Sequence, residues 1–144
     1  MATKASAVMH RWFREVWCEG RPDSIRALFP PDGQAHGLGP EPVRGPEAFL
    51  EFWNTFRATF SEIHIAVLAE VDEGPLTYVR CLANMKFRGR LVTLEGGCLS
   101  RIRDGRIAEC WNTWDFVSLL VGMGSLPADV IPRAFAGGGF VPAP

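Results

Sequence analysis

Three side chains of the 144-residue chain could exchange or hold a proton beside a bound substrate. His36 lies in a Gly-rich extended segment, and its unperturbed pKa of about 6.5 suits a general acid or base. Asp115 follows the last expected strand, where a carboxylate can act as a base or cap the next helix. Asn112 cannot act as a base, because an amide has no useful proton affinity, but it can hydrogen-bond a carbonyl or enolate oxygen. We predict these three as catalytic residues, with helix capping and local backbone hydrogen bonding as alternatives for Asp115 and His36.

The remaining polar groups indicate less chemistry. Cys98 could be a nucleophile only beside a basic group, which the sequence does not supply, so a buried thiol is the better interpretation. His10 and His64 lie far from His36 in the sequence, so we expect no metal site. The chain contains no nucleotide-binding, zinc-protease or serine-hydrolase motif, and we expect no cofactor.

Charge and composition restrict the partners. The chain carries 15 basic and 16 acidic residues without a basic stripe, which argues against nucleic acid as a partner. It has neither an apolar run of membrane-spanning length nor a signal-like run in residues 1–10, so we expect no membrane contact. Four cysteines without paired spacing indicate reduced thiols, as in a cytoplasmic protein.

The apolar periodicity predicts helices first and strands afterwards. Helices are expected at about residues 6–19, 22–29 and 46–60, the third with a wide aromatic stripe, and a short one at 116–123. Alternating patterns predict strands at about 63–71, 76–87, 91–103 and 106–114, after a short extended segment at 34–38. This order indicates an α+β domain over residues 1–126. The Gly/Pro-rich apolar tail, 127–144, is expected to pack along a surface or partner without forming an element. The uncovered sheet face predicts a homodimer.

Side-chain alternation defines which residues of the expected strands share a face. Ile63 and Val71 are expected on one face of the first strand, and Cys110 and Asn112 on one face of the fourth, with Ile107 opposite. The central strands each have a face of small, weakly polar residues. The opposite faces carry charges that can pair across strands, namely Arg80, Glu95, Arg101 and Glu109.

Small residues cannot fill the space between a bent sheet and a long aromatic helix, whereas protein interiors are close-packed. The sequence therefore predicts a cavity for a small apolar or aromatic organic molecule. The alternative is that the aromatic side chains of the third helix fill the space unaided. The predicted substrate-binding residues are Phe49, Trp53, Phe56, Cys81, Met85, Cys98, Cys110 and Trp114.

The chain resembles the SnoaL-like polyketide cyclase family of the nuclear transport factor 2-like superfamily. The matching segments are 13–20 (FREVWCEG), 36–39 (HGLG), 44–49 (RGPEAF), 100–107 (SRIRDGRI) and 111–116 (WNTWDF). The resemblance implies a cone-shaped, curved antiparallel sheet with N-terminal helices packed on its concave face and a cofactor-independent cavity site. In the family's cyclases an aspartate late in the last strand is the acid/base for an aldol closure, and a histidine lies in the preceding strand. The matching positions here are Asn112 and Cys98, which counts against an unmodified cyclase mechanism.

Three functions remain open from the sequence. The first is a cyclase- or isomerase-type enzyme, in which His36 or Asp115 takes a proton next to a carbonyl and Asn112 holds the enolate oxygen. The second is a non-catalytic ligand binder or accessory protein, which the missing aspartate favours. The third is hydroxylase- or epoxide-hydrolase-like water addition, which is less favoured because Asp115 has no second carboxylate on the cavity side.

Overall fold

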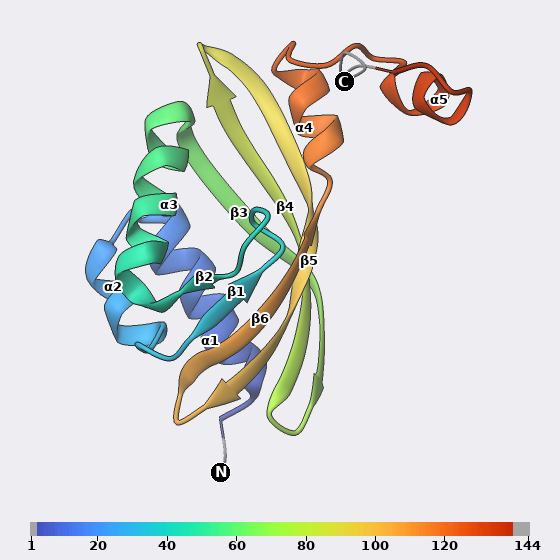
Figure 1. Cartoon of the computed structure of the whole chain (residues 1–144). Coiled ribbons are helices and arrows are strands. Elements are labelled where there is room, and N and C mark those ends of the chain that lie inside the picture. The colour runs from blue at the N-terminus through green and yellow to red at the C-terminus, as the bar shows by residue number, and fades with distance from the viewer. Residues whose placement is uncertain (1–2, 140–144) are drawn as a thin grey trace.

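The computed structural model describes residues 3–139, in which helices lie against one side of a curved sheet (Figure 1). The helices are α1 (Ala5–Trp12), the π-helix η1 (Phe13–Cys18), α2 (Pro22–Leu28), α3 (Gly45–Thr59), α4 (Phe116–Gly122) and α5 (Val130–Phe135). The strands are β1 (Gln34–His36), β2 (Val43–Arg44), β3 (Ser61–Glu73), β4 (Leu76–Phe87), β5 (Arg90–Arg103) and β6 (Arg106–Trp114). The predicted α+β fold, with N-terminal helices on the concave face of a curved sheet, is confirmed.

The first predicted helix consists of two differently wound parts. After α1 the chain widens into η1, where the Glu19 N–H donates to the Arg14 carbonyl five residues back at 2.8 Å. The first turn of α1 receives its cap from a distant strand, because Asp72 of β3 accepts the Ser6 N–H at 2.7 Å. Such a bond satisfies one of the donors that every helix start leaves unpaired.

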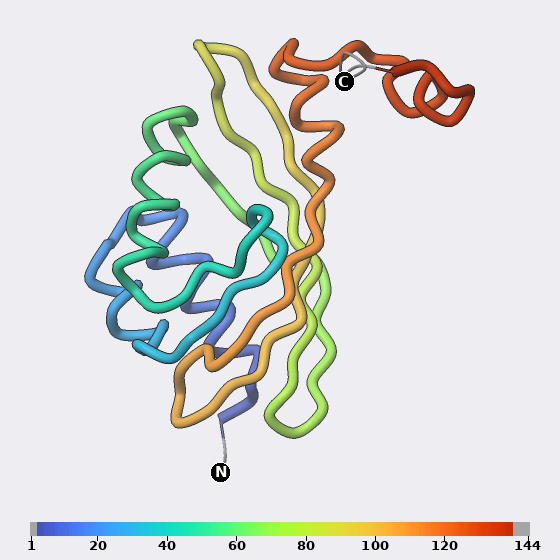
Figure 2. Tube along the Cα trace, viewed as in Figure 1, coloured from blue at the N-terminus to red at the C-terminus, as the bar shows by residue number. Residues whose placement is uncertain are grey.

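The six strands form one open sheet in the order β2-β1-β6-β5-β4-β3. The four long strands follow each other as an antiparallel meander, whereas β1 runs parallel to β6 and pairs with the short β2. The N-terminal helices and α3 cover the concave face, and α4 lies at one end of the sheet, away from the start of α1 (Figure 2). Among the described residues no helix is long and apolar enough to cross a membrane.

Two β-bulges change the predicted side-chain alternation. The β3–β4 register shifts between Val67 and Ala69, so Val71 is 67 % exposed on the convex face instead of sharing the face of Ile63. The β5–β6 register also shifts, which leaves Ala108 without a partner and turns Ile107 to the same buried side as Cys110. Both predicted placements are wrong, because one inserted residue inverts the alternation beyond it.

The tail also differs from its prediction. Residues Val130–Phe135 form the short helix α5, although no element was expected there. None of its residues is buried, and Phe135 is 89 % exposed. The helix therefore lies outside the core of the domain.

The convex face carries a row of apolar side chains across four neighbouring strands. We call this row, Val71, Tyr78, Leu99 and Trp111, the convex band, since each residue is the cross-strand partner of the next. Charged pairs flank it, with Arg80 and Glu95 3.8 Å apart and Arg101 and Glu109 3.8 Å apart, as predicted from the sequence.

Candidate functional site

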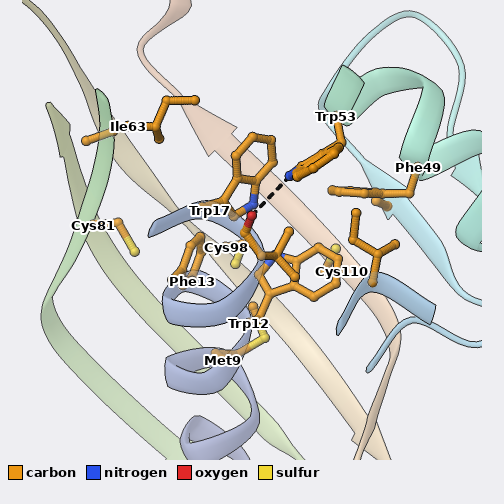
Figure 3. Packing of buried hydrophobic residues seen from close by; sticks show 14 of the residues in the cluster. Met9, Trp12, Phe13, Trp17, Phe49, Trp53, Ile63, Cys81, Cys98 and Cys110 are labelled. Carbon is orange, nitrogen blue, oxygen red and sulfur yellow. Dashed lines mark hydrogen bonds between the residues drawn. The ribbon is translucent and has the colours of Figure 1, made fainter. Parts of the chain in front are cut away.

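A cavity of about 60 Å³ lies between the N-terminal helices, α3 and the concave face of the sheet. In Figure 3 Met9, Trp12, Phe13 and Trp17 come from the N-terminal helices, near Phe49 of α3 and the sheet cysteines. An apolar cavity that holds benzene has a volume of about 150 Å³. The predicted cavity is therefore present but narrow, because aromatic rings occupy most of the space. The aromatic lining residues are Trp12, Phe13, Trp17, Phe29, Phe49, Phe52, Phe56, Trp114 and Phe116.

The structure places most of the predicted substrate-binding residues in the cavity lining and two of them outside it. Those that line the cavity are Phe49, Phe56, Met85, Cys98, Cys110 and Trp114, whereas Trp53 and Cys81 are buried outside the lining. The Trp53 indole N–H donates to the Val16 carbonyl at 3.0 Å, the dashed line in Figure 3, and so satisfies a carbonyl of η1. Cys81 is the strand partner of Gly96 and is 1 % exposed.

Sequence reasoning missed the contribution of the first helix to the cavity. Met9, Trp12, Phe13 and Trp17 line it, although their spacing indicated only a buried helix face. The π-helical winding of η1 was not readable from the sequence, and two residues of this segment, Phe13 and Trp17, line the cavity. A helix of mixed winding presents a different face from the one that a 3.6-residue period predicts.

Among the described residues that line the cavity, Asn112 is the one with a side-chain amide or carboxyl group. Its Nδ2 donates to the His36 carbonyl at 3.0 Å and lies 3.5 Å from the Cys110 Sγ. Its Oδ1 accepts the Trp114 indole N–H at 3.1 Å. The amide therefore connects β1 with two neighbours on its own strand, β6.

Close approach of β1 makes this network possible. Gly37 has φ +85°, and a Cβ built there would lie 2.1 Å from the Asn112 carbonyl oxygen. Any other residue would push the His36–Gly37 peptide away from Asn112. The next residue, Leu38, lines the cavity.

His36 was predicted as a catalytic residue of the cavity site, but its side chain does not border the cavity. Its strand pairs in parallel with β6 so that His36 is the partner of Trp111, and both side chains face the convex side. The imidazole stacks on the Trp111 ring at 5.7 Å, and its Nε2 lies 2.7 Å from Glu109 Oε2. Only the carbonyl of His36 contacts the cavity network, through Asn112.

Asp115 is an exposed cap of α4, and it lies outside the cavity lining. Its Oδ1 accepts the Ser118 N–H at 3.0 Å, and its Oδ2 accepts the Ser118 hydroxyl at 2.6 Å. These hydrogen bonds hold the pKa of Asp115 below its usual value, which weakens it as a base. The capping alternative from the sequence is confirmed.

The sheet side of the cavity is rich in neutral thiols. Burial raises the pKa of Cys98 to about 11, and burial together with neighbouring Cys98 raises that of Cys110 to about 12. Both side chains are protonated near neutrality and are poor nucleophiles. Within residues 3–139 no group of histidine, cysteine, aspartate or glutamate side chains is arranged to hold a metal ion. The lining therefore offers shape, apolar contact and one amide.

A curved sheet with helices across its concave face and an apolar cavity between them defines the class of nuclear transport factor 2-like proteins. The family model described as SnoaL-like polyketide cyclase matches residues 7–121. The chain therefore belongs to this family, which supports an enzyme that acts on a small molecule. A comparison with curated protein sequences finds no significant match.

Solved structures of similar proteins agree with this assignment. Wild-type IdmH from Streptomyces antibioticus, a proposed polyketide cyclase, is 28% identical, with a TM-score of 0.73 over 85% of this chain and 99% of that one. A proposed SnoaL-like polyketide cyclase from Jannaschia sp. CCS1 is 19% identical, with a TM-score of 0.74 over 85% and 93% of the two chains. AclR from Streptomyces galilaeus, a proposed hydroxylase, is 18% identical, with a TM-score of 0.72 over 90% and 92%. The last two likenesses concern the fold alone.

Proposed function

We propose that the protein is a cofactor-independent enzyme of the SnoaL-like cyclase or isomerase type, acting on a polyketide-like or aromatic carbonyl compound. The observation that carries this proposal is the apolar cavity walled by aromatic side chains. Within residues 3–139, Asn112 is the only residue of its lining with an amide or carboxyl group. Family membership supports a small-molecule enzyme of this kind. If the partly buried side chains Phe52 and Phe56 move to enlarge it, such a cavity can hold a flexible chain in the conformation that closes a ring.

Orientation is the main catalytic contribution in this proposal. Holding the two reacting atoms of a flexible chain in position restricts its rotations and lowers the barrier, by at most the about 7–11 kcal/mol that full orientation of two separate reactants can contribute. A β-dicarbonyl substrate enolises in water unaided, and the proton that its carbon loses to water is balanced by the proton that the new hydroxyl group takes from water. Asn112 occupies the position that matches the family's aspartate, and the thiols of the lining are protonated near neutrality. The acid/base roles predicted for His36 and Asp115 would require a substrate that reaches the convex side or the start of α4.

Product analysis tests the proposal. The purified protein is incubated with a panel of linear and aromatic β-keto esters, and products are separated by liquid chromatography and identified by NMR. NMR is needed because a ring closure by isomerisation leaves the mass unchanged. A cyclic product formed by the native protein and not by heat-denatured protein supports the proposal. Recovery of every panel compound unchanged contradicts it for this substrate class.

A non-catalytic ligand binder is the second candidate, and the hydrogen bonding of Asn112 favours it. Both donor positions of the amide are already engaged within the protein. Tight binding of a panel compound that is recovered chemically unchanged would support this function. Water addition has less support, because the described lining contains no carboxylate.

A further inference from the structure

The hydrogen bonds of Asn112 leave one bonding position for a ligand. A side-chain amide has two donor hydrogens and an oxygen that can accept two hydrogen bonds. The two hydrogens point to the His36 carbonyl and the Cys110 sulfur, and the oxygen accepts one bond from the Trp114 indole. One acceptor position on Oδ1 is therefore free.

The network also fixes the orientation of this amide. If oxygen and nitrogen were exchanged, the amide oxygen would face the His36 carbonyl oxygen and the NH₂ group would face the Trp114 N–H. Both contacts would be repulsive, so only one orientation satisfies the neighbours. The group available to a ligand is an acceptor and not a donor.

The rest of the lining offers a ligand little else to bond. Cys98 Sγ already lies 3.7 Å from the Ser100 hydroxyl, which donates to it, and the other polar groups of the described lining are the Cys110 thiol and the indole N–H donors of Trp12 and Trp17. Asn112 Oδ1 is therefore the strongest acceptor that the lining offers. An apolar ligand that covers Oδ1 would leave its free position without a partner, at a cost in affinity. A ligand hydroxyl or N–H would satisfy it.

We infer that the cavity selects a flat, largely apolar molecule that carries a hydroxyl or N–H donor over one of the same shape without a donor. This inference rests on the proposed function, because it assumes that the cavity is the ligand site. It also corrects the expectation that Asn112 holds a carbonyl or enolate oxygen, since that role needs a donor that the amide has already used. In the proposed reaction the selected group is a substrate hydroxyl or N–H away from the bond that forms.

The test compares phenol with fluorobenzene, which has nearly the same shape but no donor. Dissociation constants are measured by ¹H–¹⁵N NMR titration, read at the Trp114 indole N–H and the Asn112 side-chain amide. Small probes are chosen because the cavity volume is about 60 Å³ and partly buried rim residues such as Phe52 and Phe56 must move to admit a ring. One neutral hydrogen bond predicts binding of phenol about 3- to 10-fold tighter than that of fluorobenzene.

Variants separate the acceptor from general apolar binding. Asn112→Leu is expected to reduce the phenol preference to about one, since it removes the acceptor. Asn84→Leu, a matched change on the convex-face side of β4, is expected to keep the preference. Trp114→Phe removes the indole donor but leaves Oδ1 in place, so the preference is expected to persist even if Asn112→Leu fails to fold.

The outcomes distinguish failure of this inference from failure of the proposed function. The inference is overturned if the wild-type protein binds phenol and fluorobenzene equally. It is also overturned if the preference for phenol persists in Asn112→Leu or disappears in Trp114→Phe. In each of these cases the cavity remains a ligand site. If neither probe shifts the Trp114 signal at millimolar concentration, the cavity does not bind small aromatic molecules, and the proposed function fails as well.

Discussion

Replacement of Asn112 by aspartate tests the geometry of the site most sharply. The substitution Asn112→Asp keeps the size of the side chain and restores the carboxyl group of the family's cyclases. It also exchanges Nδ2, which donates to the His36 carbonyl at 3.0 Å, for an oxygen. An ionised carboxylate would then face a carbonyl oxygen in an apolar cavity, and only the Trp114 N–H would still donate to it.

The expected loss of stability follows from these contacts. Two neutral hydrogen bonds contribute about 0.5–1.5 kcal/mol each, and an incompletely paired buried charge adds to their loss. We expect Asn112→Asp to lower the free energy of unfolding by roughly 2–4 kcal/mol at pH 8. A protonated carboxyl can donate to the His36 carbonyl instead, so at low pH the loss should shrink to about 1 kcal/mol.

The pKa of the introduced carboxyl determines how the stability of the variant changes with pH. Burial and the facing carbonyl raise the pKa of the introduced carboxyl in the folded state above its unfolded value of about 3.9. The stability of the variant relative to wild type should therefore fall as the pH rises from about 4, and level off above the raised folded pKa. Urea denaturation at pH 5 and pH 8 measures this difference. A variant as stable as wild type at pH 8 would refute the reasoning.

Asn84→Asp is the matched control for this series. Asn84 is half-buried on β4, and no hydrogen bond involves its side chain among the described residues. The same chemical change there should alter the free energy of unfolding by no more than about 0.5 kcal/mol. A pH dependence as large as that of Asn112→Asp would show that the effect does not come from the cavity.

Other predictions follow from contacts outside the amide network. Asp72→Ala should cost about 1 kcal/mol, because it removes the carboxylate that accepts the Ser6 N–H at 2.7 Å. Partial desolvation raises the pKa of Asp72, but hydrogen bonds from Ser6 and Thr77 and the nearby Lys4 charge together leave the pKa below its usual value. The stability that the ionised Asp72 contributes should be present above about pH 4 and lost as the pH falls through the lowered pKa, which denaturation at pH 7 and pH 3 measures. With pKa values raised to about 11 and about 12, Cys98 and Cys110 should not react with a disulfide reagent before unfolding, and rapid labelling of the native protein would contradict this. We also propose that two copies of the protein form a dimer through the convex band. Leu99→Glu should then convert the dimer to a monomer in sedimentation velocity, and a monomeric wild type would refute the proposal.

The sequence predicted the elements well because their signals are local. The aromatic stripe of α3 and the alternating pattern of β4 depend on residues close in the chain, and both were identified nearly to their ends. The charged residues of the convex face were also identified, since side-chain alternation along β4, β5 and β6 places them on the same face. The bulge at Ala108 then sets Glu109 opposite Arg101.

The site was less predictable because its geometry depends on single inserted residues. The bulge at Ala108 turned Ile107 inward, and the bulge after Val67 turned Val71 outward. Neither bulge carries a sequence signal such as a glycine. His36 was predicted as a catalytic residue, but its side chain lies on the convex face, because its orientation depends on which residue of β6 it pairs with. A parallel pairing between distant segments cannot be read from one sequence.

The central claim is that substrate is held in the cavity and not on the convex side. Turnover of a panel substrate by three variants tests it most directly. Ala83→Leu adds bulk to a buried lining residue, whereas His36→Gln and Asp115→Asn alter groups outside the lining, and asparagine still caps a helix. With native-like folding verified for each variant, the account predicts that Ala83→Leu lowers turnover at least about tenfold and the other two change it by less than about twofold. Normal turnover by Ala83→Leu, together with loss of activity in His36→Gln or Asp115→Asn, would contradict it.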